Sequence, residues 1–150
     1  MNDKTRTILQ IIAHPTMSEL RIGQTLSFLS AAVWVICLLW PGETMHRPTY
    51  QVMAAFTDDF GWAVVFALVA GLQGTRLLLT PSLPLPLACV INGIVAFVWV
   101  FTSISMLASV YPPPAAIAGE IVVTLASVWV FAHYKTAQAK EHYELGDVWH

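Results

Sequence analysis

The amino-acid sequence predicts an all-α, polytopic membrane protein with four transmembrane helices. Of its 150 residues, 57% are hydrophobic and only 11% are charged, whereas about a quarter of the residues in a soluble domain carry charge. The apolar residues fall into four runs separated by proline and glycine. Each run is about as long as the roughly 20 residues that a helix needs to cross the hydrocarbon core of a bilayer. We therefore expect residues 1–150 to form a single membrane domain.

The N-terminal part predicts a surface helix followed by the first span. Residues 3–13 mix charged side chains with isoleucine and leucine and are too short to cross a bilayer, which is typical of a helix that lies in the membrane interface. Pro15 ends this helix. The first span is predicted over residues 20–40, with Trp40 at the interface, where aromatic rings are favoured.

The rest of the chain predicts one interfacial segment, three more spans and a tail. Residues 43–59 are less apolar and predict a short helix on the outer membrane surface. Proline-rich stretches mark the turns around the third span. The last helix is expected to continue into water and to stop at Gly146. The predicted spans are 60–79, 86–110 and 115–134, and the cytoplasmic helical tail is 135–150.

The charges predict the orientation. Positively charged residues gather on the cytoplasmic side of membrane proteins. On the predicted topology only Arg47 lies on the other side. Both termini are therefore expected in the cytoplasm of a bacterial cell, with the protein in the inner membrane. The cytoplasmic positive charges are Lys4, Arg6, Arg21, Arg76, Lys135 and Lys140.

Glu120 is the most informative residue because it lies inside the fourth span. It follows Pro114 by about 9 Å along a helix axis. A carboxylate in hydrocarbon is energetically costly, so Glu120 should face protein or water, or be protonated. Thr124 and Ser127 continue the same helical face. This polar stripe predicts either a glutamate hydrogen-bonded within the bundle or the lining of a pore or proton site.

Further polar residues allow similar pairs of interpretations. Asp58 and Asp59 lie near the outer end of the second span and are either solvated acids at a helix start or a cation site at an outer vestibule. Asn92 belongs to a polar or small face of the third span. Such faces predict a bundle with its polar sides inward, or an oligomer around a wet pathway. The faces are Gln24, Ser27, Ala31 and Trp34 in the first span and Asn92, Ala96, Trp99, Ser103 and Met106 in the third.

Small residues line one side of the second span. Small side chains let membrane helices approach closely, so this stripe predicts helix packing within one chain or between subunits. Its members are Ala63, Ala67, Ala70, Gly71 and Gly74.

Composition and motifs argue against several functions. A net charge of -2 is unsuitable for nucleic acid, which needs clustered Lys and Arg. Cys37 and Cys89 lie near opposite membrane faces, too far apart for a disulfide. No histidine spacing matches a metal site, including His142 and His150 in the tail with their acidic neighbours. We expect no metal, no cofactor and no enzymatic activity.

Two function hypotheses follow. The first is a non-enzymatic homo-oligomer that forms or gates an ion pathway lined by Glu120, Asp58, Asp59, Asn92, Thr124 and Ser127. The second is an interaction or exclusion module that binds another membrane or phage protein through residues 43–59 or the tail. The size and sparse loops resemble small phage membrane proteins such as holins and superinfection-exclusion proteins, in architecture alone. The tail lacks the dense basic cluster common in holins.

Overall fold

The computed structural model of the protein is all-α. It describes residues 17–42, 44–79, 84–109 and 117–147, with side chains between residues 19 and 139. Four of its helices are long and apolar enough to cross a membrane. The described helices are α2 (Met17–Leu39), α3 (Gln51–Ala54), α4 (Asp59–Leu79), α5 (Leu85–Ser109) and α6 (Ile117–Asp147), with short 3-10 turns η1 (Thr44–His46) and η2 (Pro48–Tyr50).

The four long helices coincide with the four predicted spans, and local sequence explains their ends. Helix α2 ends at Leu39, just before Pro41, which cannot continue a helix. Helix α5 places Pro86 in its first turn, where the missing N–H is not needed. Helix α6 continues to Asp147, which confirms the predicted helical extension beyond the last span.

The described chain begins with a spanning helix. Its first helix, α2, is itself a candidate span and not an interfacial helix. The interfacial helix predicted over residues 3–13 lies outside the described residues. The predicted helix in residues 43–59 is present as η1, η2 and α3. It is broken into short pieces because Pro48 lacks the N–H that a continuous helix would need.

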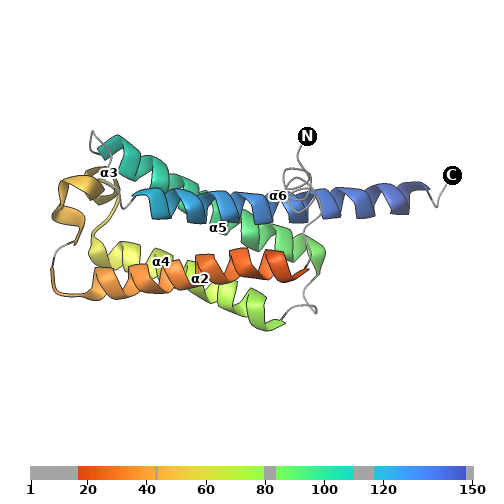
Figure 1. Ribbon diagram of the computed structural model, residues 1–150, viewed down its shortest axis with the longest axis horizontal. Coiled ribbons are helices and arrows are strands. Elements are labelled where there is room, and N and C mark those ends of the chain that lie inside the picture. Colours follow the sequence, from red (N-terminus) through yellow and green to blue (C-terminus); the bar gives the residue numbers. More distant parts are fainter. Residues whose placement is uncertain (1–16, 43, 80–83, 110–116, 148–150) are drawn as a thin grey trace, which may run out of the picture.

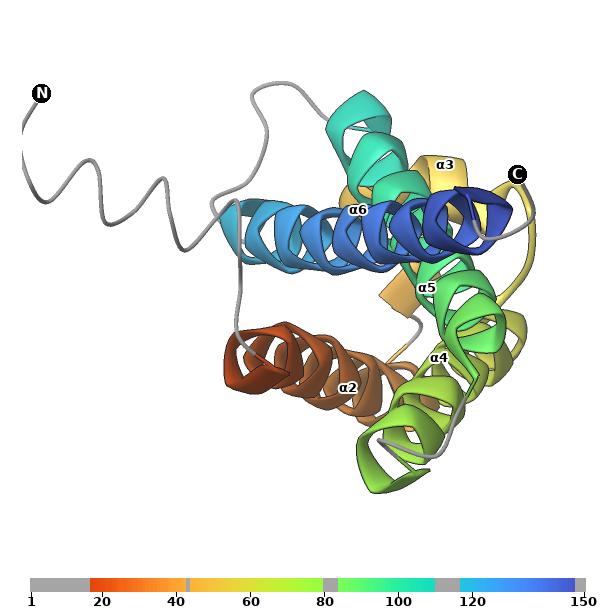
Figure 2. The same cartoon turned by 90° about the vertical axis from the view of Figure 1, so that its right-hand side faces the viewer.

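The spans pack as a four-helix bundle through which the chain runs back and forth (Figures 1 and 2). Helix α2 packs against α4 and α6, and α5 packs against α6 and α4. Helices α2 and α6 approach closely at Gly23, where an added Cβ would lie 2.9 Å from Cγ2 of Val130. Helix α6 projects past the other spans with the C-terminal end of the described chain (Figure 1).

The bundle has apolar surfaces and a partly polar interior. Large apolar side chains are exposed along every span, for example Leu78 at 83% and Phe97 at 69%. Water cannot cover four such faces favourably, so lipid does. The predicted polar faces of the first and third spans are buried inside this single chain. The chain is therefore a multi-pass membrane protein whose helices pack with their polar faces inward.

Residues 44–58 cover one end of the bundle, called here the Asp58 end (Figure 1). Met45 and Met53 are buried beneath this segment. The Trp62 ring N–H donates to the Met53 carbonyl over 2.9 Å, and the Val52 N–H donates to Oγ of Ser109 over 3.1 Å. These two bonds tie the segment to both α4 and α5. The opposite end of the bundle is called here the Arg76 end.

Candidate functional site

The central feature of the bundle is a carboxylate held by an indole. The ring N–H of Trp34 in α2 donates to Oε1 of Glu120 in α6 over 2.8 Å. The second oxygen, Oε2, is buried and has no hydrogen-bond partner in the described part of the chain. Glu120 therefore faces protein, which is one of the alternatives that its position in the sequence allowed, and keeps one acceptor available.

Trp34 is also part of an aromatic cluster. Its ring stacks on Phe66 of α4 with centroids 4.9 Å apart and an interplanar angle of 14°. Tyr50 of η2 meets the other side edge-on at 5.5 Å. Burial raises the pKa of the Tyr50 hydroxyl, and the nearby Glu120 charge raises it further. The Trp34 ring thus connects the buried carboxylate to the segment that covers the Asp58 end.

Hydroxyl groups continue the polar path from Glu120 into the bundle. Thr124, one turn further along α6, donates to the Trp99 carbonyl over 3.0 Å and lies 2.7 Å from the Ser103 hydroxyl. The Trp99 ring N–H in turn donates to Oγ of Ser27 over 2.8 Å. These bonds join α2, α5 and α6 at one level.

The remaining predicted interior residues, Ser127 and Asn92, lie closer to the Arg76 end than Glu120 does. Ser127 is buried on the same face of α6 as Thr124. Asn92 is buried in α5, and its amide N–H donates to the Ala88 carbonyl over 2.8 Å. Oγ of Ser127 and Oδ1 of Asn92 have no hydrogen-bond partner among the described residues. The structure thus places Glu120, Thr124, Ser127 and Asn92 in the bundle interior.

Asp58 and Asp59 occupy different positions from these four. Asp58 is exposed, and its Oδ1 accepts the Gly61 N–H over 2.8 Å, which caps the start of α4. Oδ1 of Asp59 accepts the Met45 N–H over 3.1 Å and anchors η1 to α4. Both carboxylates therefore stabilise the Asp58 end through local bonds.

The small residues of α4 divide between two sides. Ala63 is buried, and an added Cβ at Gly74 would lie 3.4 Å from the Phe28 ring of α2. Ala67 and Gly71 are exposed on the outside of the bundle. The half-buried Ala70 packs against buried apolar side chains of the bundle core. The stripe thus contributes to packing within the chain and also leaves a small-residue face towards lipid.

Sequence reasoning missed the contact made by Arg76. Arg76 was predicted only as a positive charge on the cytoplasmic side, but its side chain is buried and only 4% exposed. Its guanidinium donates to the Tyr134 hydroxyl over 2.8 Å and lies 4.9 Å from the centre of that ring. The available signal was spacing, because Arg76 follows the buried residues Val69 and Gln73 at helical intervals.

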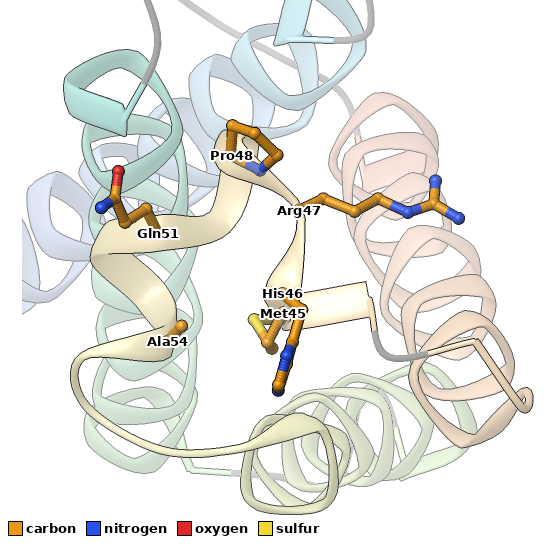
Figure 3. A pocket seen from close by; sticks show the side chains of 6 residues that line it. All are labelled: Met45, His46, Arg47, Pro48, Gln51 and Ala54. Atoms are coloured by element: carbon orange, nitrogen blue, oxygen red, sulfur yellow. The ribbon is translucent and has the colours of Figure 1, made fainter.

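Two surface cavities flank the segment at the Asp58 end. One, of about 420 Å³, is lined by residues of η1, η2 and α3 (Figure 3). The Arg47 side chain extends away from its centre, towards α2 (Figure 3). The second cavity, of about 500 Å³, lies between this segment and the end of α2 and is lined by Cys37, Trp40, Arg47 and Tyr50 among others.

The side chains between residues 19 and 139 form no cluster of metal ligands. No three His, Cys, Asp or Glu residues of this region are grouped so that they could hold an ion. Cys37 and Cys89 are both free thiols. The acidic and histidine residues of the tail lie outside this region. No family model, curated protein or solved structure matches the chain.

Proposed function

We propose that this protein is a small, non-enzymatic inner-membrane protein that conducts or gates the passage of protons or small cations. The observation that carries the proposal is Glu120, a carboxylate inside a spanning helix that is held by Trp34 and has one buried oxygen unpaired within the described chain. Ionisable groups at such positions mark ion and proton pathways in membrane proteins.

The polar groups beside Glu120 support a path inside each bundle. Thr124 and Ser127 follow it on one face of α6 and extend the polar line by roughly 10 Å along the helix axis. The Ser103 hydroxyl adjoins Thr124. Asp58 and Asp59 would contribute negative potential at the mouth of this path, which attracts cations.

Trp34 is the proposed gate. It bonds to Glu120 and also packs against Phe66 and Tyr50. Protonation of Glu120 removes the negative charge that strengthens the indole hydrogen bond. A change at the carboxyl group would therefore be transmitted to the aromatic cluster at the Asp58 end.

The proposed orientation places the Asp58 end outside the cell. It rests on the charge bias, with six of seven Lys and Arg residues on the Arg76 side of the predicted topology. Both termini are then cytoplasmic. We propose self-association through the outward small-residue face of α4 at Ala67 and Gly71, which permits close helix approach. Chemical cross-linking in native membranes tests this, and an exclusively monomeric protein would contradict it.

The test of conduction is Glu120→Gln in proteoliposomes. Glutamine retains the size of the side chain and an acceptor for Trp34 but cannot release a proton. We expect wild-type vesicles to dissipate an imposed pH gradient, which is followed with an internal pH dye. The rate of dissipation in Glu120→Gln vesicles should be at least tenfold lower. Glu19→Gln, at the other end of the bundle, serves as the matched control and should retain the wild-type rate.

Two results would contradict conduction: wild-type vesicles no leakier than protein-free vesicles, or equal rates for Glu120→Gln and wild type. Circular dichroism and gel filtration of each variant establish that the bundle is intact. An ion-selective electrode for potassium in the same vesicles separates proton from cation movement.

An interaction module is the second candidate. Two observations favour it: residues 44–58 form a folded segment flanked by two cavities, and α6 projects beyond the span as a helix. Truncation after Tyr134 discriminates the candidates, because a pathway within the spans should survive it and an adaptor that uses the tail should not. A cross-linking pull-down that recovers no partner would contradict the second candidate.

A further inference from the structure

A layer of buried polar side chains crosses the bundle on the Arg76 side of Glu120. Each of the four spans contributes one residue that is at most 3% exposed, and each residue has a polar atom with no hydrogen-bond partner in the described part of the chain. The atoms are Nε2 of Gln24, Oε1 of Gln73, Oδ1 of Asn92 and Oγ of Ser127.

Contacts between the helices place these residues in the same stretch of the bundle. Gly23 beside Gln24 approaches Val130, and Gly93 beside Asn92 approaches Phe131. Val130 follows Ser127 on α6 by one turn. Gly74 next to Gln73 meets Phe28, one turn from Gln24. At a rise of about 1.5 Å per residue, these contacts place the four backbone positions within roughly 12 Å of one another along the bundle axis.

The hydrophobic core divides in the same stretch. Among the described side chains it consists of two separate buried clusters, one towards each end of the bundle. Gln24 lies between Leu20 of one cluster and Ala31 of the other. Asn92 and Ser127 likewise separate members of the two clusters. The cluster members on either side of these polar residues are Cys89 and Val95 in α5, and Val123 and Val130 in α6.

The chemistry of the four atoms selects the ligand. Buried polar atoms without partners are rare because each has lost its hydrogen bonds to water. This set contains an N–H donor, two carbonyl acceptors and a hydroxyl that can do either. An anion binds to donors alone and a bare cation to acceptors alone, whereas this set offers both. Water both donates and accepts, and buried waters typically make about three hydrogen bonds to otherwise unpaired groups.

We propose that Gln24, Gln73, Asn92 and Ser127 form an internal hydration site that holds a small cluster of water between the two core clusters. The site lies about 10 Å along α6 from Glu120. Its role as the next stretch of the proton path rests on the proposed function, whereas the binding of water does not. The site is a layer shared by all four spans, so it requires the assembled bundle.

Water-edited solid-state NMR on proteoliposomes tests the site without measuring transport. Magnetisation transferred from water should reach the side-chain amides of Gln24 and Asn92 at rates comparable to that of the exposed Gln51. The buried Trp62 ring N–H, which donates to a carbonyl, is the dry control and should receive little. Amides of Gln24 and Asn92 as dry as Trp62 would overturn the proposal.

Apolar near-isosteres provide a second test through the melting temperature in detergent. If the four atoms hold water, Gln24→Met, Gln73→Met, Asn92→Leu and Ser127→Ala should each lower it by roughly 3 °C, because the water and the other three groups lose a partner. The fourfold variant should lose less than the sum of the four. Single variants that each raise the melting temperature would overturn the proposal. Wet amides in a protein that conducts nothing would refute the proposed function alone.

Discussion

Replacing Gly23 by alanine tests the closest approach between α2 and α6. The added methyl carbon would lie 2.9 Å from Cγ2 of Val130, whereas carbon atoms attract best at about 3.5–4.0 Å. Valine has one strongly preferred rotamer in a helix, so its methyl group cannot easily turn away. The two helices would therefore have to separate. Overpacking of this kind costs about 1–3 kcal/mol, and each 1.4 kcal/mol is a tenfold change in the folding equilibrium.

The free energy of unfolding can be measured by titrating mixed micelles with a denaturing detergent and following tryptophan fluorescence. We expect Gly23→Ala to lower it by about 1–3 kcal/mol. Gly119→Ala is the matched control, because an added Cβ there meets nothing within 4 Å. It should not destabilise the bundle and can stabilise it by up to about 1 kcal/mol, because alanine favours a helix more than glycine does. Equal effects of the two substitutions would refute the assignment of Gly23 as a contact point.

A double-mutant cycle attributes the effect to Val130. Val130→Ala removes the methyl groups that the new side chain would strike. The cost of Gly23→Ala should therefore be smaller in that background, with a coupling energy of at least about 1 kcal/mol. Additive effects of the two substitutions would show that the cost arises elsewhere.

Two further predictions concern the Arg76 end and the orientation. Tyr134→Phe removes the hydroxyl bonded to Arg76 but retains the ring beneath the guanidinium, so it should lower the free energy of unfolding by about 0.6 kcal/mol. Tyr134→Leu also removes the ring and should lower it by about 0.5–1 kcal/mol more. Equal losses for the two variants in the same titration would contradict the cation–π contact. In a Cys89→Ser background, a membrane-impermeant maleimide should label Cys37 in spheroplasts, because Cys37 lines the surface cavity beside Arg47, and labelling only after lysis would reverse the proposed orientation.

The spans could be predicted from the sequence because their signal is local. Runs of apolar residues must be helical in lipid, since an unpaired backbone has no water to bond to. The inward faces of α2 and α5 were also predictable, because Gln24 and Asn92 repeat with other polar or small residues at helical spacing. In a membrane protein apolar side chains face lipid and polar side chains face the bundle interior, so the helical spacing of the polar residues alone identified the buried side.

The pairings in the site could not be predicted in the same way. Glu120 was identified as an interior residue, but its bond to Trp34 joins positions 86 residues apart. Arg76 near a helix end was compatible with the headgroups or with the core, and only the presence of Tyr134 opposite it favoured the core. Such choices depend on which helix is adjacent and how it is rotated, information that no single span contains.

The sequence by itself determined the four crossings, the charge bias and the polarity of each helix face, because hydrophobic length and helical period are properties of one segment. Tertiary structure alone decided that Trp34 holds Glu120, and that the polar residues of four separate spans share one layer. Those features arise from the register between helices, which is set by contacts such as Gly23 with Val130 and Gly93 with Phe131.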